Sequence, residues 1–435
     1  MRKKEQTPGV VQFSHPKNAG LTEGNMGQNL LIQELLLVQL AKDKPKDADD
    51  KLPVSVLHPA NLTSNGTGAL AIQNGQHRFL RYTIYFFFFL AWVFLIFSVT
   101  AGPSFHTWLA DWKRWDANWY EQIWLKGYPA SDPKTLVFPP GYPLLVGMLA
   151  KLFSGSFMGT AIVLNLIAFF STAALISDWF SDKFRISPYL LFGFVLSAPT
   201  SYIVFTAYSD IVFMLLLWVL LWLTLSSKRP AGRKALIAQS LTLFVLPWIR
   251  LTGYALTSWL IDRKVVAFMV IGSFALWLGF NRVVAGSPFY FLHAQQLFAM
   301  PEGNFVQGLS FSVGQLFSSD LHNGYVTSWV QFAFLPLFYF GALTAAAIWL
   351  AKTGEGLLSI TLLSILVLSH NQGVWRSVIR YDLPLLPFLC LPLLVTSRSF
   401  ATSYVFKATF YLLMLSQFAL QFYFARAFHS GNWAF

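Results

Sequence analysis

Apolar residues dominate the chain from residue 82 onward, where long hydrophobic stretches alternate with short polar segments. An α-helix needs roughly 20 apolar residues to cross the hydrocarbon core of a bilayer. Stretches near that length predict about ten spanning segments, at residues 82–100, 158–176, 189–206, 211–225, 235–261, 265–280, 326–351, 357–369, 383–395 and 404–424. The pattern therefore predicts an all-α polytopic membrane protein.

Residues 1–77 have a different pattern, because they are rich in Lys, Asp, Gly, Asn and Pro and almost free of aromatic residues. Such a segment cannot bury enough apolar surface to fold, which predicts a flexible, cytoplasmic tail before a membrane domain at residues 78–435. Within the tail, residues 29–41 form an apolar run too short to span a bilayer. That run predicts an interfacial or partner-binding helix, or a transient helix with no role.

Composition supports the membrane assignment. Of 435 residues, 55% are hydrophobic and 11% are charged, which excludes a water-soluble domain. The net charge of +12 does not indicate a nucleic-acid partner, because the basic residues lie between apolar segments rather than along one face. The single cysteine, Cys390, leaves neither an internal disulfide nor a cysteine metal site.

The positions of Lys and Arg predict the orientation, since cytoplasmic loops carry an excess of basic residues. Arg78 and Arg81 precede the first span and place the N-terminus inside. Five further basic loops are assigned to the inner side, at residues 183–185, 228–234, 263–264, 352 and 398–407. The outer loops are then residues 101–157, 207–210, 281–325 and 370–382.

Strict alternation of the spans requires two refinements. Residues 144–153 must stay on the outer side, and residues 235–261 must fold as a hairpin of two short half-helices. Pro247 and Gly253 flank Arg250 in the middle of that hairpin. Because proline breaks a helix and an arginine facing lipid is costly, we expect Arg250 to be buried against a partner at the turn.

The outer loops hold the candidate chemistry. Eight acidic residues fall in them, namely Asp111, Asp116, Glu121, Asp132, Asp210, Glu302, Asp320 and Asp382. Residues 111–128 (DWKRWDANWYEQIWLKGY) are the densest segment and follow the first span directly. At helical spacing they form one apolar face suited to the membrane surface, made of Trp112, Trp115, Trp119, Tyr120 and Ile123.

Two interpretations of this segment stay open. It is an amphipathic anchor with solvated charges, or it holds a base, Asp116, at the membrane boundary. The sequence FPPGYP at residues 138–143 favours the second interpretation, because three prolines and a glycine fix a rigid turn that an anchor does not need.

Seven short segments resemble one known family, in order along about residues 82–425. Residues 114–120 (RWDANWY), 127–128 (GY) and 138–143 (FPPGYP) resemble the signature of the second mannosyltransferase of GPI-anchor synthesis, PIG-V, and its bacterial relatives. Four later segments are similar to later family elements, at residues 207–210 (AYSD), 250–253 (RLTG), 293–296 (HAQQ) and 380–384 (RYDLP). Trp119 stands where the eukaryotic pattern has His, and Pro140-Gly141 and the long tail also depart from that pattern. These departures favour a bacterial relative in the plasma membrane rather than the endoplasmic reticulum.

The resemblance implies a GT-C-like bundle of about ten transmembrane helices, with interfacial helices in a long first outer loop. Its implied activity is that of a membrane glycosyltransferase. A hexose, mannose-like, would pass from a polyprenyl-phosphate donor to a glycan, glycolipid or protein acceptor on the outer or lumenal face. No nucleotide-sugar site or other cofactor is implied, and by similarity Asp116 is the catalytic base.

Each of the main charged candidates has two possible roles, one in binding or catalysis and one in structure. Asp116 would take the proton of the acceptor hydroxyl, or would serve only as the ion-pair partner of Arg114. Asp210 would orient the acceptor, or would cap the helix that begins at Ile211. Arg250 needs a buried partner, which either a phosphate or Asp210 would supply.

The remaining candidates would bind substrate. Arg376 and Arg380 can hold phosphate oxygens in a bidentate manner, or they position lipid head groups. His293 and Gln295 would donate to sugar hydroxyls, or they are solvated. Further candidates for substrate binding are Arg114, Trp115, Tyr120, Tyr208 and Tyr381. No His, Asp or Glu spacing indicates a metal site, and no nucleotide-binding motif is present.

Two other classes compete with this prediction. Charged residues near membrane depth also mark the substrate path of a transporter or lipid flippase. A noncatalytic membrane subunit, with residues 29–41 recruiting a partner, is the third possibility.

Overall fold

The computed structural model describes residues 67–102, 104–129, 132–184, 186–225, 232–260, 264–296, 304–317, 330–371, 378–389 and 404–431. Residues Gly68–Phe435 form one compact unit. The first described helix begins at Thr67, so the boundary predicted at residue 77 falls inside a helix. The apolar run at 29–41, Cys390, Arg376, Glu302 and Asp320 lie outside the described residues.

Regular structure within the described ranges is entirely helical. The α-helices are α2 (Thr67–Thr100), α3 (Phe105–Asp111), α4 (Asp116–Lys126), α5 (Gly141–Leu152), α6 (Phe157–Phe184), α7 (Pro188–Ser197), α8 (Asp210–Leu225), α9 (Arg233–Ile249), α10 (Lys264–Ala285), α11 (Tyr290–Gln296), α12 (Phe305–Phe317), α14 (Leu335–Lys352), α15 (Gly356–His370), α16 (Val378–Tyr381) and α18 (Tyr404–His429). Four tighter 3-10 helices are η1 (Pro133–Val137), η2 (Ser201–Phe205), η3 (Leu251–Leu260) and η6 (Leu383–Leu389), and η5 (Val330–Phe334) is a π-helical turn.

Four helices in the described part of the chain are long and apolar enough to cross a membrane. They are Gln76–Thr100 within α2, Phe157–Phe184, Ala267–Ala285 within α10, and Leu335–Lys352. Shorter apolar helices accompany them, at Gly141–Leu152, Pro188–Ser197, Asp210–Leu225 and Gly356–His370. The chain thus has the helices of a multi-pass membrane protein.

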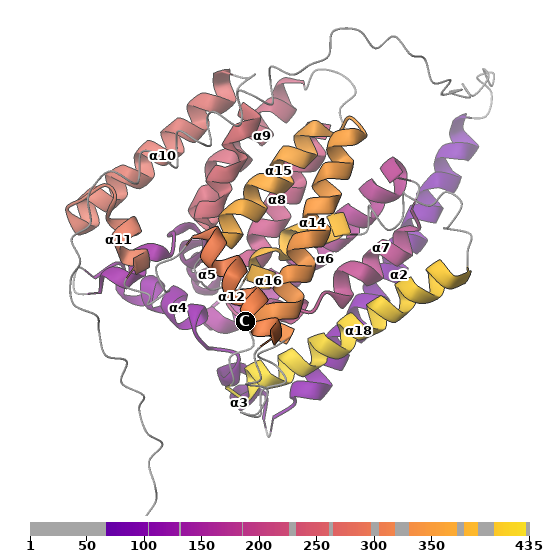
Figure 1. Ribbon diagram of the computed structural model, residues 1–435, viewed down its shortest axis with the longest axis horizontal. Coiled ribbons are helices and arrows are strands. Elements are labelled where there is room, and N and C mark those ends of the chain that lie inside the picture. Colours follow the sequence, from indigo (N-terminus) through magenta and orange to yellow (C-terminus); the bar gives the residue numbers. More distant parts are fainter. Residues whose placement is uncertain are drawn as a thin grey trace, which may run out of the picture. The chain divides into compact units, whose positions relative to one another are not determined.

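Long helices pack side by side, and short helices gather near one end of them (Figure 1). α6 contacts α7 and α8, α8 contacts α9, α9 contacts α10, and α14 contacts α15. α4 and α16 are among the short helices, and both carry residues predicted to be functional. The ends of the long helices therefore meet the segments that hold the candidate chemistry.

The predicted span at 189–206 is two elements rather than one. α7 ends at Ser197 and η2 begins at Ser201, with Pro199 between them. Ala198 is extended, at φ −51° and ψ 131°, as the residue before a proline prefers. The side-chain amide nitrogen Nε2 of Gln421, on α18, donates to the carbonyl oxygens of Leu196 and Ala198 at 3.0 Å each. The break therefore leaves both oxygens paired.

The hairpin predicted at 235–261 is present, with Arg250 at its turn. α9 ends at Ile249, Arg250 is extended at φ −150°, and η3 begins at Leu251. A Cβ at Gly253 would lie 2.7 Å from the backbone nitrogen of Pro247, so only glycine allows the two arms to approach this closely. Pro247 lies inside α9, so the first arm continues past this proline to Ile249.

The prediction of one amphipathic helix that contains both Trp112 and Ile123 is wrong. α3 ends at Asp111 and α4 begins at Asp116, so a turn separates Trp112 from the rest of the expected face. Trp112 is fully buried, with its ring against Tyr202, Phe205 and Phe428. Trp112 is therefore part of the protein core and does not lie at the membrane surface as predicted.

Candidate active site

Four charged side chains converge from four segments that lie far apart in the sequence. Asp116 is the first residue of α4, and Asp210 is the first residue of α8. Arg250 follows the last residue of α9, and Arg380 lies in the four-residue helix α16. Three of these residues lie at the end of a helix, and Arg380 lies in a helix of a single turn.

Arg380 bridges the two carboxylates. Its Nη2 atom lies 2.8 Å from Oδ2 of Asp116, and its Nε atom lies 3.6 Å from Oδ1 of Asp210. Arg250 pairs with the same Oδ1 atom of Asp210. Two arginines and two aspartates therefore form one continuous chain of ion pairs whose charges balance.

Two tyrosine rings complete this charged cluster, which we define as Asp116, Asp210, Arg250 and Arg380. The Cζ atom of Arg380 lies 4.7 Å from the ring centre of Tyr208 and 4.8 Å from that of Tyr381. Arg250 also lies over Tyr381, at 4.8 Å. The negative face of an aromatic ring attracts a guanidinium, so both arginines are held by rings as well as carboxylates.

Burial differs between the members of the cluster. The side chains of Asp210 and Arg380 are 3% and 5% exposed, whereas those of Arg250 and Asp116 are 15% and 20% exposed. Burial opposes the charge of Arg380, but the carboxylates of Asp116 and Asp210 outweigh it and raise the pKa of the guanidinium above its ordinary value. Asp116 and Arg250 are thus the two members of the cluster that solvent reaches most.

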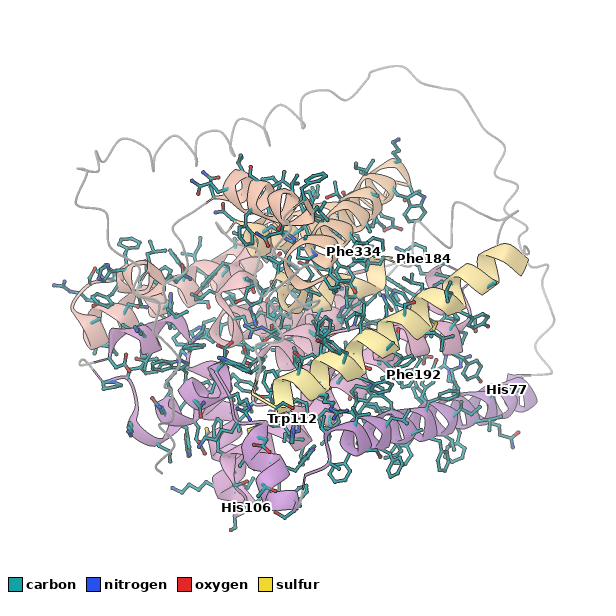
Figure 2. All side chains as sticks on the ribbon, turned by 60° about the horizontal axis from the view of Figure 1, so that its bottom comes forward. His77, His106, Trp112, Phe184, Phe192 and Phe334 are labelled. Carbon is teal, nitrogen blue, oxygen red and sulfur yellow. The ribbon has the colours of Figure 1, made fainter. Side chains whose placement is uncertain are left out.

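The turn before Asp116 is strained. Trp115 has φ +45° and ψ −115°, a conformation that residues with a side chain rarely adopt. Its ring packs at 4.7 Å against Phe428 of α18, and Figure 2 shows the neighbouring Trp112 beside one end of the yellow helix α18. Backbone strain of this kind persists only where the surroundings impose it, and it is concentrated at functional sites.

The FPPGYP segment packs beneath α4. Tyr128 donates to the carbonyl oxygen of Phe138 at 2.6 Å, and the Phe138 ring lies 5.2 Å from that of Tyr120. A Cβ at Gly141 would lie 2.6 Å from the carbonyl oxygen of Trp248, near the end of α9. This glycine lets α5 approach the segment that carries Arg250, so the turn positions two parts of the site.

Neutral hydrogen bonds hold the segment before Asp210. The hydroxyls of Tyr120 and Ser209 lie 2.7 Å apart, and burial raises the pKa of Tyr120 well above its ordinary value. The Nδ2 atom of Asn165 on α6 donates to the carbonyls of Thr206 and Tyr208, at 2.8 and 3.2 Å. Sequence reasoning missed Asn165 and Ser209, although a lone Asn inside an apolar span is a signal for such a role.

Other predicted residues lie elsewhere. Arg114 contacts the carboxylate and carbonyl of Asp111 and the carbonyl of His429, while Asp116 pairs with Arg380. His293 and Gln295 are exposed on α11, which packs beside η1. Arg376 lies outside the described residues. Of the predicted residues, the structure brings together Asp116, Asp210, Arg250, Arg380, Tyr208 and Tyr381, with Tyr120 adjacent.

An apolar groove of about 890 Å³ lies between α2, α3 and α6. Phe94 and Phe97 of α2, Phe105 and Trp108 of α3, and Ile162 and Ile167 of α6 contribute to its walls. None of the charged cluster lines it. Its apolar walls are suited to a hydrocarbon chain. In the sequence, α3 is followed by the strained turn and then by Asp116.

In the ranges that the structure describes, no three His, Cys, Asp or Glu side chains gather to hold a metal ion. The cluster offers two guanidinium groups that can hold an anion, one partly exposed carboxylate that can accept a proton, and aromatic rings around them. No family model, curated protein or solved structure matches the chain.

Proposed function

We propose that the chain is a GT-C-type membrane glycosyltransferase with about ten spans, a bacterial relative of the PIG-V family. One observation carries the proposal. The segments RWDANWY, AYSD, RLTG and RYDLP, which carry the resemblance, contribute Asp116, Asp210, Arg250 and Arg380 to a single cluster. Nothing in the spacing of these segments along the chain requires that their charged residues meet.

The proposed reaction moves a hexose, mannose-like, from a polyprenyl-phosphate donor to an acceptor hydroxyl. The acceptor oxygen forms a bond to the anomeric carbon, and the bond from that carbon to the phosphate oxygen breaks. The phosphate leaves with the electron pair, and Asp116 takes the hydroxyl proton. Arg380 and Arg250 hold the departing phosphate, a role that suits the planar guanidinium.

Exchange of ion pairs is a necessary part of this proposal. In the structure, Oδ2 of Asp116 is in contact with Nη2 of Arg380 at 2.8 Å, so this oxygen is not free to meet an acceptor hydroxyl. A donor phosphate that binds Arg380 competes for the guanidinium and frees this oxygen for the acceptor hydroxyl. The donor would therefore prepare the base as it binds.

The distribution of charged pairs supports a site on one side of the membrane. Asp178 and Lys183 lie in the last two turns of α6, where they pair with Arg81 and Glu355 at 3.1 and 2.6 Å. The candidate cluster is built from other helix ends, and the apolar middle of α6 separates these pairs from the α5 end of that helix. We assign the cluster to the outer face of the plasma membrane, following the basic loops.

The test is transfer by the purified protein in liposomes, supplied with labelled polyprenyl-phosphate mannose and a panel of glycan, glycolipid and peptide acceptors. We expect Asp116→Asn to reduce turnover by about 10²-fold or more, as loss of a general base does. Glu121→Gln is the matched control, because Glu121 lies on the same helix and only pairs with Lys113. Equal transfer by both variants would contradict the assignment, and lipid movement without transfer would support a flippase.

A further inference from the structure

The helix that presents Arg380 is too short to fix its own position. α16 has four residues, and isolated helical turns are unstable because nucleation costs more than one hydrogen bond returns. Its backbone continues through Asp382, whose N–H donates to the carbonyl of Val378 at 2.8 Å and whose carbonyl accepts from Leu385 at 2.8 Å. The position of Arg380 must therefore be set by contacts outside α16.

A buried group of polar side chains supplies one such contact. The Ser369 hydroxyl donates to Oδ1 of Asp382 at 2.9 Å, and Nε2 of His370 lies 3.6 Å from Oδ2 of the same carboxyl. Ser369 and His370 end α15, and their side chains also meet at 3.0 Å. His370 and Asp382 are 0% exposed and Ser369 is 2% exposed.

The hydrogen-bonding pattern indicates an uncharged group. Nδ1 of His370 lies 2.9 Å from the carbonyl oxygen of Leu366, which can only accept, so the ring proton belongs on Nδ1. Nε2 then carries no proton and lies 3.6 Å from Oδ2 of Asp382, so this contact is not an ion pair. Burial raises the pKa of Asp382 well above its ordinary value, against the opposing effect of the Ser369 hydrogen bond.

We propose that Ser369, His370 and Asp382 are positioning residues that fix α16 against α15, so that Arg380 meets Asp116 and Asp210. We call these three residues the α15–α16 clasp. Asp382 is only two residues from Arg380, so a shift of its backbone moves the guanidinium that bridges both carboxylates. The clasp contributes geometry and no net charge.

A second contact holds the other side of the same segment. Nε1 of Trp218 on α8 donates to the carbonyl oxygen of Pro384 at 2.9 Å. α8 begins at Asp210, so this bond ties the segment after α16 to the helix that carries one of the partners of Arg380. The Trp218 contact attaches this segment to α8, and the clasp attaches it to α15.

The test compares Asp382→Leu with Asp382→Asn in the full-length protein in liposomes. Asparagine keeps the shape of aspartate and the Oδ1 acceptor that Ser369 donates to, whereas leucine fills the space without that acceptor. Ser359→Ala is the matched control, because Ser359 is also buried on α15 and donates to Ala347 at 2.7 Å, far along the helix from the clasp.

Hydrogen exchange of the amides at 378–389 is the first readout, and it does not depend on any activity. We expect exchange about tenfold faster in Asp382→Leu, and unchanged in Asp382→Asn and Ser359→Ala, since loss of local hydrogen bonds raises local opening. Unchanged exchange in Asp382→Leu would overturn the proposal. If that variant does not fold, Ser369→Ala gives the same comparison.

Transfer kinetics are the second readout, and they rest on the proposed function. We expect turnover about tenfold lower in Asp382→Leu at a melting temperature close to that of the wild type, with rescue by Asp382→Asn. Loss of turnover only in proportion to loss of stability would show a merely structural role. Absence of transfer in the wild type would reject the proposed function, and exchange would still decide whether the clasp fixes α16.

Discussion

Nη2 of Arg380 lies 2.8 Å from Oδ2 of Asp116, although the two residues are far apart in the amino-acid sequence. The guanidinium is almost completely buried and also reaches Asp210, so it neutralises two carboxylates that would otherwise repel each other. Removal of Arg380 is therefore expected to affect both stability and chemistry.

Arg380→Gln should lower the free energy of unfolding by about 3 kcal/mol, because Asp116 loses its cation and the buried Asp210 keeps only Arg250. The double variant Arg380→Gln with Asp116→Asn should recover part of this loss. Thermal unfolding in detergent of the wild type, the two single variants and the double variant gives the coupling energy of the pair. Lys113→Gln is the control, since the side chain of Lys113 is 40% exposed and its ion pair should contribute less than about 1 kcal/mol. A coupling energy near zero would contradict the ion-pair chain.

Tyr381 separates the effect of an aromatic ring from that of a hydroxyl. Its ring lies 4.8 Å from both Arg250 and Arg380. Tyr381→Phe should retain the melting temperature of the wild type, whereas Tyr381→Leu should lose about 1–2 kcal/mol of stability with the two cation–π contacts. If the phenylalanine variant were as unstable as the leucine variant, the hydroxyl rather than the ring would be responsible.

Asp382 predicts a pH dependence of stability. Its folded pKa is raised by burial, while an unfolded aspartate ionises near pH ~4. As pH rises above ~4, the unfolded state releases this proton and the folded state does not, so the contribution of Asp382 to stability falls by up to about 1.4 kcal/mol per pH unit until pH reaches the folded pKa. His370 on α15 and Tyr339 on α14 are the titratable groups that face this carboxyl.

Asp382→Asn removes this titration. The melting temperature of the variant relative to wild type should therefore increase between pH 5 and pH 8, and should approach a constant below about pH 4. Thermal unfolding across that range provides the measurement. A relative melting temperature that decreases with pH would show that Asp382 is ionised in the folded protein.

Gln421 should be important for stability although it is remote from the charged cluster. Its Nε2 atom donates to the carbonyls of Leu196 and Ala198, and its Oε1 atom accepts from Nε1 of Trp92 at 3.0 Å. Gln421→Leu leaves these groups unpaired in an apolar interior and should cost about 1–3 kcal/mol, measured by thermal unfolding. Tyr423→Phe, an exposed position on the same helix, should have little effect. Equal melting temperatures for both variants would mean that water pairs the freed carbonyls.

Cysteine labelling tests the assigned orientation. In a Cys390→Ser background, a membrane-impermeant maleimide added to intact cells should label Asp111→Cys and should leave Lys352→Cys unlabelled. Both positions are accessible in the folded protein, and permeabilised cells provide the control for their reactivity. The reverse pattern would place the charged cluster on the cytoplasmic side.

Sequence reasoning found the members of the charged cluster but not their pairing. The motifs identified Asp116, Asp210, Arg250 and Arg380, and the need of a buried arginine for a partner correctly suggested Asp210 for Arg250. The partner of Asp116 could not be read from the chain. Arg114 is its near neighbour in sequence, but the strained turn at Trp115 directs Arg114 toward His429 instead.

Two other differences have local causes. The helical period of residues 112–123 did not reveal the break before Asp116, because tertiary contacts of Trp112 and Trp115 impose it. Pro199 was a visible signal for the division of the span at 189–206. By contrast, His370 and Asp382 are single polar residues in apolar surroundings, and only the fold shows that they meet.

The contact between Arg114 and the carbonyl of His429 joins the turn before Asp116 to the last turn of α18. During synthesis the ribosome produces the Asp116 segment long before α18, so the nascent chain carries this turn without its anchor. The contact with His429 can form only after α18 has been synthesised and has packed beside the turn. The charged cluster therefore depends on a late-synthesised helix to hold the segment that carries Asp116.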